Sequence, residues 1–414
     1  MGKTKTLFAI LGFGITAGVL VAVVFFIFRA PPKSVAYRNV EIVIPTPTAT
    51  SLQNPSPTHT LPVETPTSKV VITPSYKVTE VVIQILPTEL FMNTARMDPE
   101  IRRQKILDSL TMIDQYPAYT MNYYGDYSLD TALANGIKDF EDITQHFESI
   151  YHINLLHNLE TQGEGESCSG FTAVSENGEY LFGHNEDWIS NDKYLVFFTA
   201  PDKGYASVNI TDISYLGEDK DALLITPFMP LAGMNSEGLV VTTYSVPQCF
   251  PPQDAKKTSL FWLVAVRLLL DRAANIDEAL QLLDEFNILF DEDMGLQFLI
   301  GDAQGYSVIV EWLDGKTIPI EKTGDWQAVT NFIQKDAAEV DIKRDQRYQI
   351  ASTFLEQYNH KISAEVGMEL LRKTSQFWGS QGGTQFSVIF NQSRRDLHIV
   401  FGRNYEKVYY FPLK

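Results

Sequence analysis

The order of strand-like and helix-like segments predicts an α+β fold built of layered sheets and helices. Residues 88–165 read as mainly helical, and the strand-like runs CSGFTAV, EYLFGHN and LVFFTA begin at Cys168. A helix pair, further strands, a helical section and a last hairpin follow. Strands and helices in separate blocks are typical of α+β proteins, whereas a doubly wound parallel sheet alternates them one by one.

The composition is that of a globular protein with an acidic surface. The 414-residue chain is 44% hydrophobic and 20% charged, which allows a sizeable core. The formal net charge of −18 argues against a nucleic-acid partner, because such proteins present a basic face. The length allows two or three domains, or one large domain with appendages, and the sequence does not indicate an oligomeric state.

An uncharged apolar segment, residues 7–28, follows the short N-terminal tail 1–6. A membrane-spanning helix needs about 20 such residues, whereas the core of a signal peptide is usually about 7–15 residues long. We therefore predict a transmembrane anchor, with a cleaved signal peptide as the alternative. Basic residues lie on both sides of the segment, so the positive-inside rule does not decide the orientation.

Residues 29–75 form a linker rich in proline and threonine, as in IPTPTATSLQNPSPTHTLPVETPTSK. Such a composition cannot bury a core and is typical of an extended, semi-rigid spacer. A tail, a span, a stalk and a large domain together indicate a cell-surface protein. We expect residues 76–414 to form a membrane-anchored domain outside the cytoplasm, or a secreted one if the apolar segment is cleaved.

Within this domain the later elements are predicted from periodicity and turn residues. A helix pair is expected at 259–275 and 276–286, with Thr258 and Asn275 as candidate N-caps. Ala303–Gly305 is expected to form the turn of a hairpin. The last segments, in chain order, are helices at 343–358 and 363–374 and a hairpin at 384–404.

The dipeptide Asn177-Gly178 predicts the hairpin that matters most. A two-residue type I′ turn needs positive φ at both central positions, and Asn-Gly is its strongest signal. With these two residues at the centre of the turn, Cys168 faces Asp187 and Gly170 faces Asn185. The hairpin therefore returns a carboxylate to the neighbourhood of a thiol.

A thiol with an ordinary pKa of about 8.5 needs a base to become a good nucleophile. His184 is one candidate that the hairpin delivers. The alternative is an α-amine on the cysteine itself, with a pKa of about 7.7–8.0, released by cleavage of the Ser167–Cys168 bond. Asp187 would then hold this amine. The polar run TQGEGES before Cys168 is the kind of segment that can be cut.

These residues resemble the start of the mature chain of N-terminal-nucleophile (Ntn) cysteine amidases. The resemblance is to the choloylglycine hydrolase and acid ceramidase-like group, and especially to the acyl-coenzyme A:6-aminopenicillanic acid acyltransferase relatives. Their pattern is a cysteine, a strand, a turn and then G-R-N-x-D-W, and this chain has GHNEDW at residues 183–188. The similarity continues in GMNSEGLVV at 233–241 and covers roughly residues 160–405.

The resemblance implies a four-layer αββα Ntn-hydrolase sandwich and a set of site residues. Cys168 matches the nucleophile, and Asp187 matches the aspartate that holds its liberated amine. Asn331 matches an asparagine near the oxyanion. Arg347 is the best match to a late active-site arginine, with Arg344 as a competitor.

Three positions differ from the pattern or vary within it. His184 stands where the pattern has arginine, which puts the substrate preference in doubt. Ser245 falls where some relatives carry an oxyanion-hole asparagine, and its hydroxyl could donate instead. Ser167, before the nucleophile, bears on how readily the chain cuts itself.

The function implied is that of a self-processing amidohydrolase or acyltransferase acting on a small linear amide. The acyl group would form a thioester on Cys168 and then be transferred to water or to an acceptor amine. A CoA thioester is a further candidate partner. Residues 76–167 would be a pro-segment or α chain, and 168–414 a β chain that begins at the nucleophile. The substrate itself is not indicated.

Two rival interpretations remain open. One is a non-catalytic stalked binding protein with a Cys168–Cys249 disulfide, since exported chains favour such bridges. The other is a papain-like protease that pairs Cys168 with His360 or His398. No metal site and no cofactor are expected, because metal-ligand spacings, a GxGxxG motif and a P-loop are all missing from the sequence.

Overall fold

The computed structural model describes residues 80–83, 97–113, 116–155, 167–189, 193–247, 249–291, 294–335, 337, 339–358 and 361–413. All of them belong to one compact unit, Ser68–Lys414. The predicted transmembrane anchor 7–28 and the linker 29–75 lie outside the described residues. In the described part of the chain, no helix combines the length and apolar character needed to cross a membrane.

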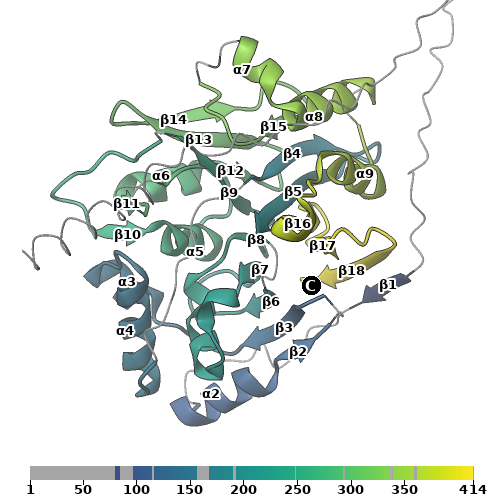
Figure 1. Cartoon of the computed structure of the whole chain (residues 1–414). Helices are drawn as coiled ribbons and strands as arrows, with labels where there is room; N and C mark the ends of the chain where they lie inside the picture. Colours follow the sequence, from purple (N-terminus) through teal and green to yellow (C-terminus); the bar gives the residue numbers. More distant parts are fainter. Residues whose placement is uncertain are drawn as a thin grey trace, which may run out of the picture. The chain divides into compact units, whose positions relative to one another are not determined.

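Two large sheets form the body of the domain (Figure 1). The seven-stranded sheet has the order β1 (Glu80–Ile83), β18 (Lys407–Pro412), β17 (Asp396–Phe401), β16 (Gly382–Asn391), β5 (Tyr180–Ile189), β4 (Ser169–Val174) and β15 (Gln327–Val329). It is antiparallel apart from the β1–β18 pair. β5 therefore has a hydrogen-bonded neighbour on each side.

The nine-stranded sheet completes the pair. Its order is β14 (Lys316–Glu321), β13 (Ser307–Leu313), β12 (Gly295–Gly301), β9 (Val240–Val246), β8 (Ala232–Asn235), β7 (Ser207–Asp212), β6 (Tyr194–Thr199), β3 (Ala118–Tyr123) and β2 (Thr111–Met112). A separate parallel pair joins β10 (Ser259–Phe261) to β11 (Asn287–Leu289).

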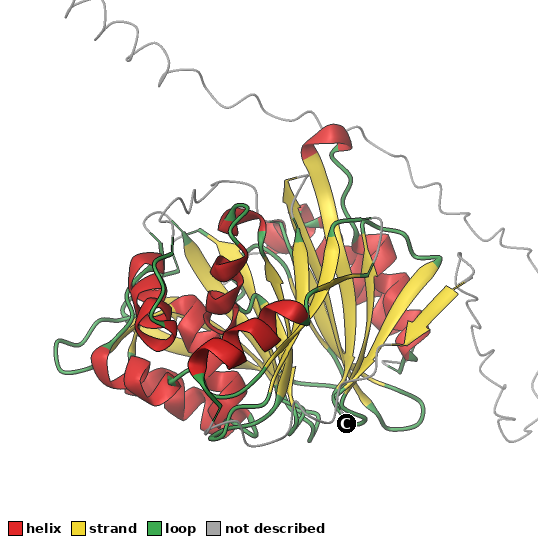
Figure 2. Cartoon of the chain, turned by 90° about the horizontal axis from the view of Figure 1, so that it is seen from below, coloured by secondary structure: helices red, strands yellow, loops and turns green. Residues whose placement is uncertain are grey.

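Helices cover the outer faces of both sheets, as the two views show (Figures 1 and 2). α8 (Gln346–Gln357) and α9 (Ala364–Thr374) pack on β4, β5, β15 and β16, whereas α5 (Trp262–Arg272) packs on β8 and β9. The other helices are α2 (Pro99–Asp108), α3 (Leu129–Asn135), α4 (Phe140–Tyr151), α6 (Ile276–Glu285), α7 (Glu339–Arg344) and the 3₁₀ turns η2 (Ser214–Leu216), η3 (Lys220–Phe228) and η4 (Gly379–Gln381). The α+β prediction is confirmed, and the layers run helix, sheet, sheet, helix.

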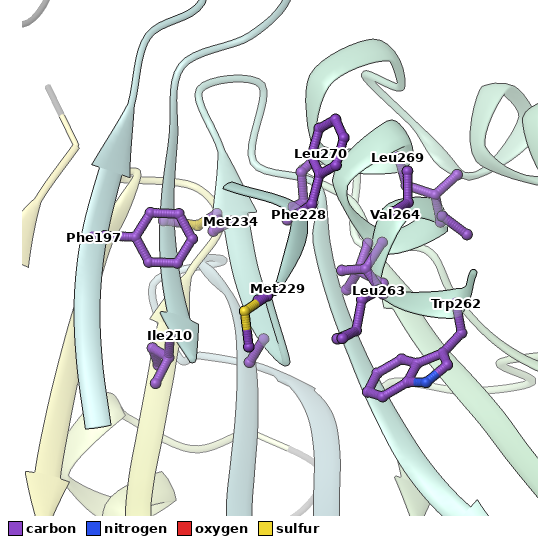
Figure 3. Close-up of a cluster of buried hydrophobic side chains, with 14 of the residues drawn as sticks. Phe197, Ile210, Phe228, Met229, Met234, Trp262, Leu263, Val264, Leu269 and Leu270 are labelled. Carbon is purple, nitrogen blue, oxygen red and sulfur yellow. The ribbon is translucent and has the colours of Figure 1, made fainter. Parts of the chain in front are cut away.

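Alternation along the strands divides the core into two clusters. Phe182 on β5 belongs to the larger cluster, which contains side chains of both sheets and of α5. Its neighbour Leu181 belongs to the smaller cluster under α8 and α9. Figure 3 shows part of the larger cluster, where Leu263 and Leu270 of α5 lie beside strand and η3 side chains such as Phe228.

Residues 88–165 are less helical than predicted. α2, α3 and α4 form as expected, but Ala118–Tyr123 is strand β3, which pairs in parallel with β6. The physical reason is that AYTMNY carries the aromatic residues that strands favour, and buried and less buried side chains alternate over its last four residues. Because this strand is only six residues long and lies between helices, a window long enough to detect a helix does not reveal it.

The helix-pair prediction holds with one correction. Asn275 caps α6, its side chain accepting a hydrogen bond from the Glu278 N–H. Thr258 is not a cap, because Ser259–Phe261 is extended as β10 and α5 begins only at Trp262. The predicted hairpin turn at Ala303–Gly305 joins β12 to β13, with Gly305 at φ +89°.

The GMNSEGL segment is held by one buried asparagine. The Asn235 side-chain amide donates to the carbonyl oxygens of Leu270 and Ala273 at 3.1 and 2.7 Å. Its oxygen accepts from the N–H groups of Glu237 and Leu239, both at 3.0 Å. One side chain therefore both shapes the β8–β9 turn and ties it to the end of α5.

Replacing Asn235 with Ala should lower the free energy of unfolding by about 3 kcal/mol or more, because several buried backbone groups lose their partners at once. Urea denaturation with an unchanged m-value would measure this loss. Asn177→Ala is the matched control, since Asn177 is exposed in the β4–β5 turn, and it should change stability by less than about 0.5 kcal/mol. Equal effects of the two substitutions would contradict the assignment.

Candidate functional site

The β4–β5 hairpin forms, but its register differs by one residue from the prediction. Ser169 pairs with Asn185 and Gly170 with His184. The loop has three residues rather than two: Ser175 N–H donates to the Glu179 carbonyl at 2.8 Å, and Gly178 takes φ +80°. A type I turn followed by a left-handed glycine is the usual three-residue loop. Continued past β4, this register sets Cys168 opposite Glu186, not Asp187.

A buried network of side-chain hydrogen bonds begins at the Cys168 sulfur. The thiol donates to Glu186 Oε2 at 3.7 Å, and the same oxygen lies 3.1 Å from His184 Nε2. On the other side of the ring, His184 Nδ1 lies 3.0 Å from the hydroxyl of Tyr244, which is on β9 of the opposite sheet. This network thus connects the start of β4, through β5, to the facing sheet.

Burial determines the protonation states of Glu186 and His184 in this network. Loss of solvent raises the pKa of Glu186 from 4.5 to about 8 and lowers the pKa of His184 from 6.5 to about 3. Both shifts have the same cause, because a low-dielectric interior disfavours the charged form of either group. His184 is therefore a neutral imidazole, and Glu186 exchanges its proton near neutral pH.

Gly170 leaves the room that the Tyr244 hydroxyl needs. A Cβ on this residue would lie 2.0 Å from that oxygen and 3.0 Å from the Gly183 carbonyl oxygen. Real Cβ atoms do not approach other atoms so closely, so any larger residue would displace the tyrosine. The glycine after Cys168-Ser169 is thus part of what positions His184.

The opposite face of β5 carries a second polar group. Asp187 is fully buried, accepts from the Thr384 hydroxyl at 2.5 Å and lies 3.4 Å from Arg347 Nη1. The same Nη1 donates to the backbone carbonyl of Cys168 at 3.0 Å. Burial raises the pKa of Asp187 to about 7, and Thr384 and Arg347 act against that rise. Two adjacent carboxyl groups thus have different partners.

Arg347 contacts Asn331 directly and is connected to Ser245 through it. Its Nη2 donates to Asn331 Oδ1 at 3.0 Å, and the Asn331 amide donates to the backbone carbonyl of Ser245 at 2.9 Å. Asp345, the N-cap of α8, accepts from the same guanidinium at 3.2 Å. Arg347 and not the exposed Arg344 makes these contacts. Ser245 joins through its carbonyl, so an oxyanion role for its hydroxyl stays a prediction.

The structure contradicts the disulfide of one rival interpretation and tests one histidine of the other. Cys168 and Cys249 are both free thiols, so the predicted alternative disulfide is absent from the structure. Cys249 is buried, its sulfur accepts from the Trp312 N–H at 3.1 Å, and burial raises the pKa of its thiol to about 11. His398 lies on β17, three strand spacings or roughly 14 Å from β4. His360 lies outside the described residues.

The donor atoms of Cys168, His184 and Glu186 lie within 4.8 Å of one another, the one such group found among the residues whose positions are described. Sulfur, imidazole and carboxylate are ligands that zinc accepts. Here, however, each atom already has a hydrogen-bond partner within the group. We assign no metal, and the absence of one stays a prediction.

Sequence reasoning missed Glu186, Tyr244 and Thr384. Glu186 could have been found, because in a strand it shares a face with His184, and a three-residue loop would have set it opposite Cys168. Tyr244 and Thr384 come from strands that are distant in sequence, and no local pattern links them to the hairpin. Asn185 of the GHNEDW motif is structural: its amide donates to the Leu371 carbonyl and Thr374 hydroxyl of α9.

The raised pKa of Glu186 predicts how stability depends on pH. Between pH 4.5 and about 8 the unfolded chain has released this proton while the folded chain keeps it, so the free energy of unfolding falls as pH rises. His184 opposes this trend only below pH 6.5, where its unfolded form is charged. We therefore expect Glu186→Gln to flatten the fall between about pH 6.5 and 8.5.

Urea titrations at several pH values would check this, with both chains carrying Cys168→Ala so that they stay in one piece. Asp187 titrates in the same window and contributes a remaining slope in both chains. An equal pH slope with and without Glu186 would show that its carboxyl is not held in the neutral form.

Comparison with known proteins gives three findings. The family model described as "Acyl-coenzyme A:6-aminopenicillanic acid acyl-transferase" matches residues 174–405. Among solved structures, a variant of conjugated bile acid hydrolase from Clostridium perfringens has 15% identity and a TM-score of 0.49, over 59% of this chain and 92% of its own. Penicillin V acylase from Agrobacterium tumefaciens has 18% identity and a TM-score of 0.44, over 57% and 83%.

No curated protein matches the chain. The family match begins six residues after Cys168 and spans more than half of the 414 residues, including His184, Asp187, Ser245, Asn331 and Arg347. The chain therefore belongs to the acyl-coenzyme A:6-aminopenicillanic acid acyltransferase family and is an enzyme, a hydrolase of linear amide C–N bonds or a related N-acyltransferase.

Proposed function

We propose that the protein is a self-processing cysteine amidase or acyltransferase that works through an acyl-thioester on Cys168. The observation that carries this proposal is the shared guanidinium of Arg347, which contacts both the Cys168 carbonyl and the Asp187 carboxylate. Cleavage of the Ser167–Cys168 bond would release an α-amine at this point. Thiol, amine and carboxylate would then belong to one small region.

In the cleaved enzyme the α-amine of Cys168 acts as the base. Its pKa of about 7.7–8.0 suits proton transfer from a thiol near neutral pH. The sulfur attacks the amide carbonyl of the substrate, and the amine passes the proton to the leaving nitrogen. The acyl-thioester is then released to water or to an acceptor amine. Asp187 and Arg347 hold the amine and the Cys168 backbone in place.

A tetrahedral intermediate needs a donor for its oxyanion. We assign this role to the Asn331 amide, because Asn331 contacts Arg347, which in turn contacts the Cys168 carbonyl. The Ser245 hydroxyl is a second candidate, because the backbone of Ser245 is hydrogen-bonded to Asn331. Losing one such donor typically costs about 2.7–4 kcal/mol of barrier. The substrate is a small linear amide, and we propose that the domain acts outside the cytoplasm, tethered by residues 7–28 and the linker.

Cys168→Ala is expected to abolish both self-cleavage and amide turnover. Intact mass and N-terminal sequencing would show a fragment that begins at Cys168 in the parent and is missing in the variant. Turnover would be followed with a panel of N-acyl-7-amino-4-methylcoumarins. Cys249→Ser is the control, because this buried thiol contacts the Trp312 N–H on β13, and the variant should keep both activities. A parent chain that stays whole, or an active Cys168→Ala variant, would refute the proposal.

Arg347→Gln should lower kcat/KM by at least about 100-fold, a loss of the size seen when one charge-stabilising group is removed. Arg344→Gln tests the competing arginine and is expected to change kcat/KM by less than about threefold, because Arg344 is exposed at the end of α7. Both variants would be assayed with the same coumarin amides after their cleavage state is established by mass. The reverse order of effects would assign the role to Arg344.

A further inference from the structure

The uncut chain lacks the base that we propose for the cleaved enzyme. Before cleavage, the nitrogen of Cys168 is part of a peptide bond and cannot accept a proton. The base that serves the mature enzyme is therefore missing when the first reaction, the cleavage itself, takes place. A different group must take the proton of the Cys168 thiol in that step.

The geometry offers Glu186 for this task. Its Oε2 lies 3.7 Å from the Cys168 sulfur and accepts the hydrogen bond of the thiol. Both residues are buried, Cys168 with 2% and Glu186 with 6% of its surface exposed. Asp187 is on the opposite face of β5, where Thr384 and Arg347 contact its oxygens. Among the residues that the structure describes, the cation Arg347 thus contacts Asp187, whereas the thiol contacts Glu186.

His184 explains why this carboxyl can both take and release a proton. The family pattern has arginine at this position, and an arginine is always charged and would hold a neighbouring glutamate in its ionised form. Here the neighbour is an imidazole that burial keeps neutral, with its Nε2 3.1 Å from Glu186. Tyr244 fixes the other ring nitrogen. His184 and Glu186 therefore form one arrangement.

We propose that Glu186 is the proton acceptor for self-cleavage of the Ser167–Cys168 bond. This inference rests on the proposed function. Glu186 takes the proton of the Cys168 thiol, and the thiolate forms a C–S bond to the Ser167 carbonyl carbon. The C–N bond then breaks, and Glu186 returns the proton to the nitrogen. Water hydrolyses the resulting thioester, which leaves a Ser167 carboxylate and a Cys168 with free amine and thiol.

The test follows cleavage of the full chain by intact mass over time. Glu186→Gln should slow the appearance of the fragment that begins at Cys168 by at least about 100-fold, the range for loss of a general base. Glu186→Asp keeps a carboxyl at a longer distance and should cleave faster than the glutamine variant. Glu179→Gln is the matched control on the same hairpin. Glu179 contacts Asn391 and Arg394 instead, and this variant should cleave like the parent.

A second measurement separates cleavage from turnover. Residues 164–167 are replaced by the factor Xa site Ile-Glu-Gly-Arg, both in the parent and in the Glu186→Gln variant. Factor Xa then exposes the amine of Cys168 in either protein. Recovery of coumarin-amide turnover by the glutamine variant after factor Xa treatment supports the proposal, because the freed amine then serves as base. It also shows that the variant is folded.

Three outcomes would overturn the inference. If Glu186→Gln cleaves as fast as the parent, Glu186 has no role in cleavage, while the proposed function stands. If the glutamine and aspartate variants stay uncut and the factor Xa-treated variant is inactive beside an active parent, Glu186 serves turnover or folding instead. If the parent itself is never cut yet hydrolyses amides, self-cleavage fails together with this inference.

Discussion

The site depends on the register of β5 between its two neighbours. Residues alternate along this strand, so His184 and Glu186 face Tyr244 of the other sheet while Asn185 and Asp187 face α9 and Arg347. A slip of one residue would exchange the two faces. Such a slip is prevented because β5 is hydrogen-bonded to β4 on one side and β16 on the other. The contacts of His184, Glu186 and Asp187 therefore depend on this pairing.

Two adjacent carboxyl groups acquire different chemistry from their surroundings. Desolvation raises the pKa of both, but Asp187 meets a guanidinium and a hydroxyl whereas Glu186 meets a thiol and a neutral imidazole. The guanidinium favours the ionised form of Asp187, which is what a partner for an ammonium group needs. The neutral surroundings of Glu186 favour proton exchange. Environment, rather than residue type, separates their roles.

Cys168 and the rest of the proposed site come from different parts of the chain. The family match starts after Cys168, and the contacts to that residue come from Glu186, on β5, and from Arg347, on α8. Asn331 links α8 back to β9 through the Ser245 carbonyl. The two sheets and the helix layer over β4 and β5 are therefore joined at the one place where the chain is proposed to cut itself.

The sequence alone determined the α+β class and the hairpin that carries Cys168 and His184, because local periodicity and a turn dipeptide are readable within short windows. The resemblance to a known family, carried by motifs such as GHNEDW, added Asp187 and Asn331 as candidate site residues and left Arg347 in competition with Arg344. Tertiary structure alone decided three things: that β3 joins a sheet within a largely helical stretch, that Glu186 rather than Asp187 faces the thiol, and that Arg347 rather than Arg344 enters the site. A single added loop residue changes which side chains meet across a hairpin, and contacts such as Tyr244 and Thr384 arise only when strands distant in sequence pack together. Burial, which sets the charge of these groups, is likewise a property of the assembled sheets and not of any short segment.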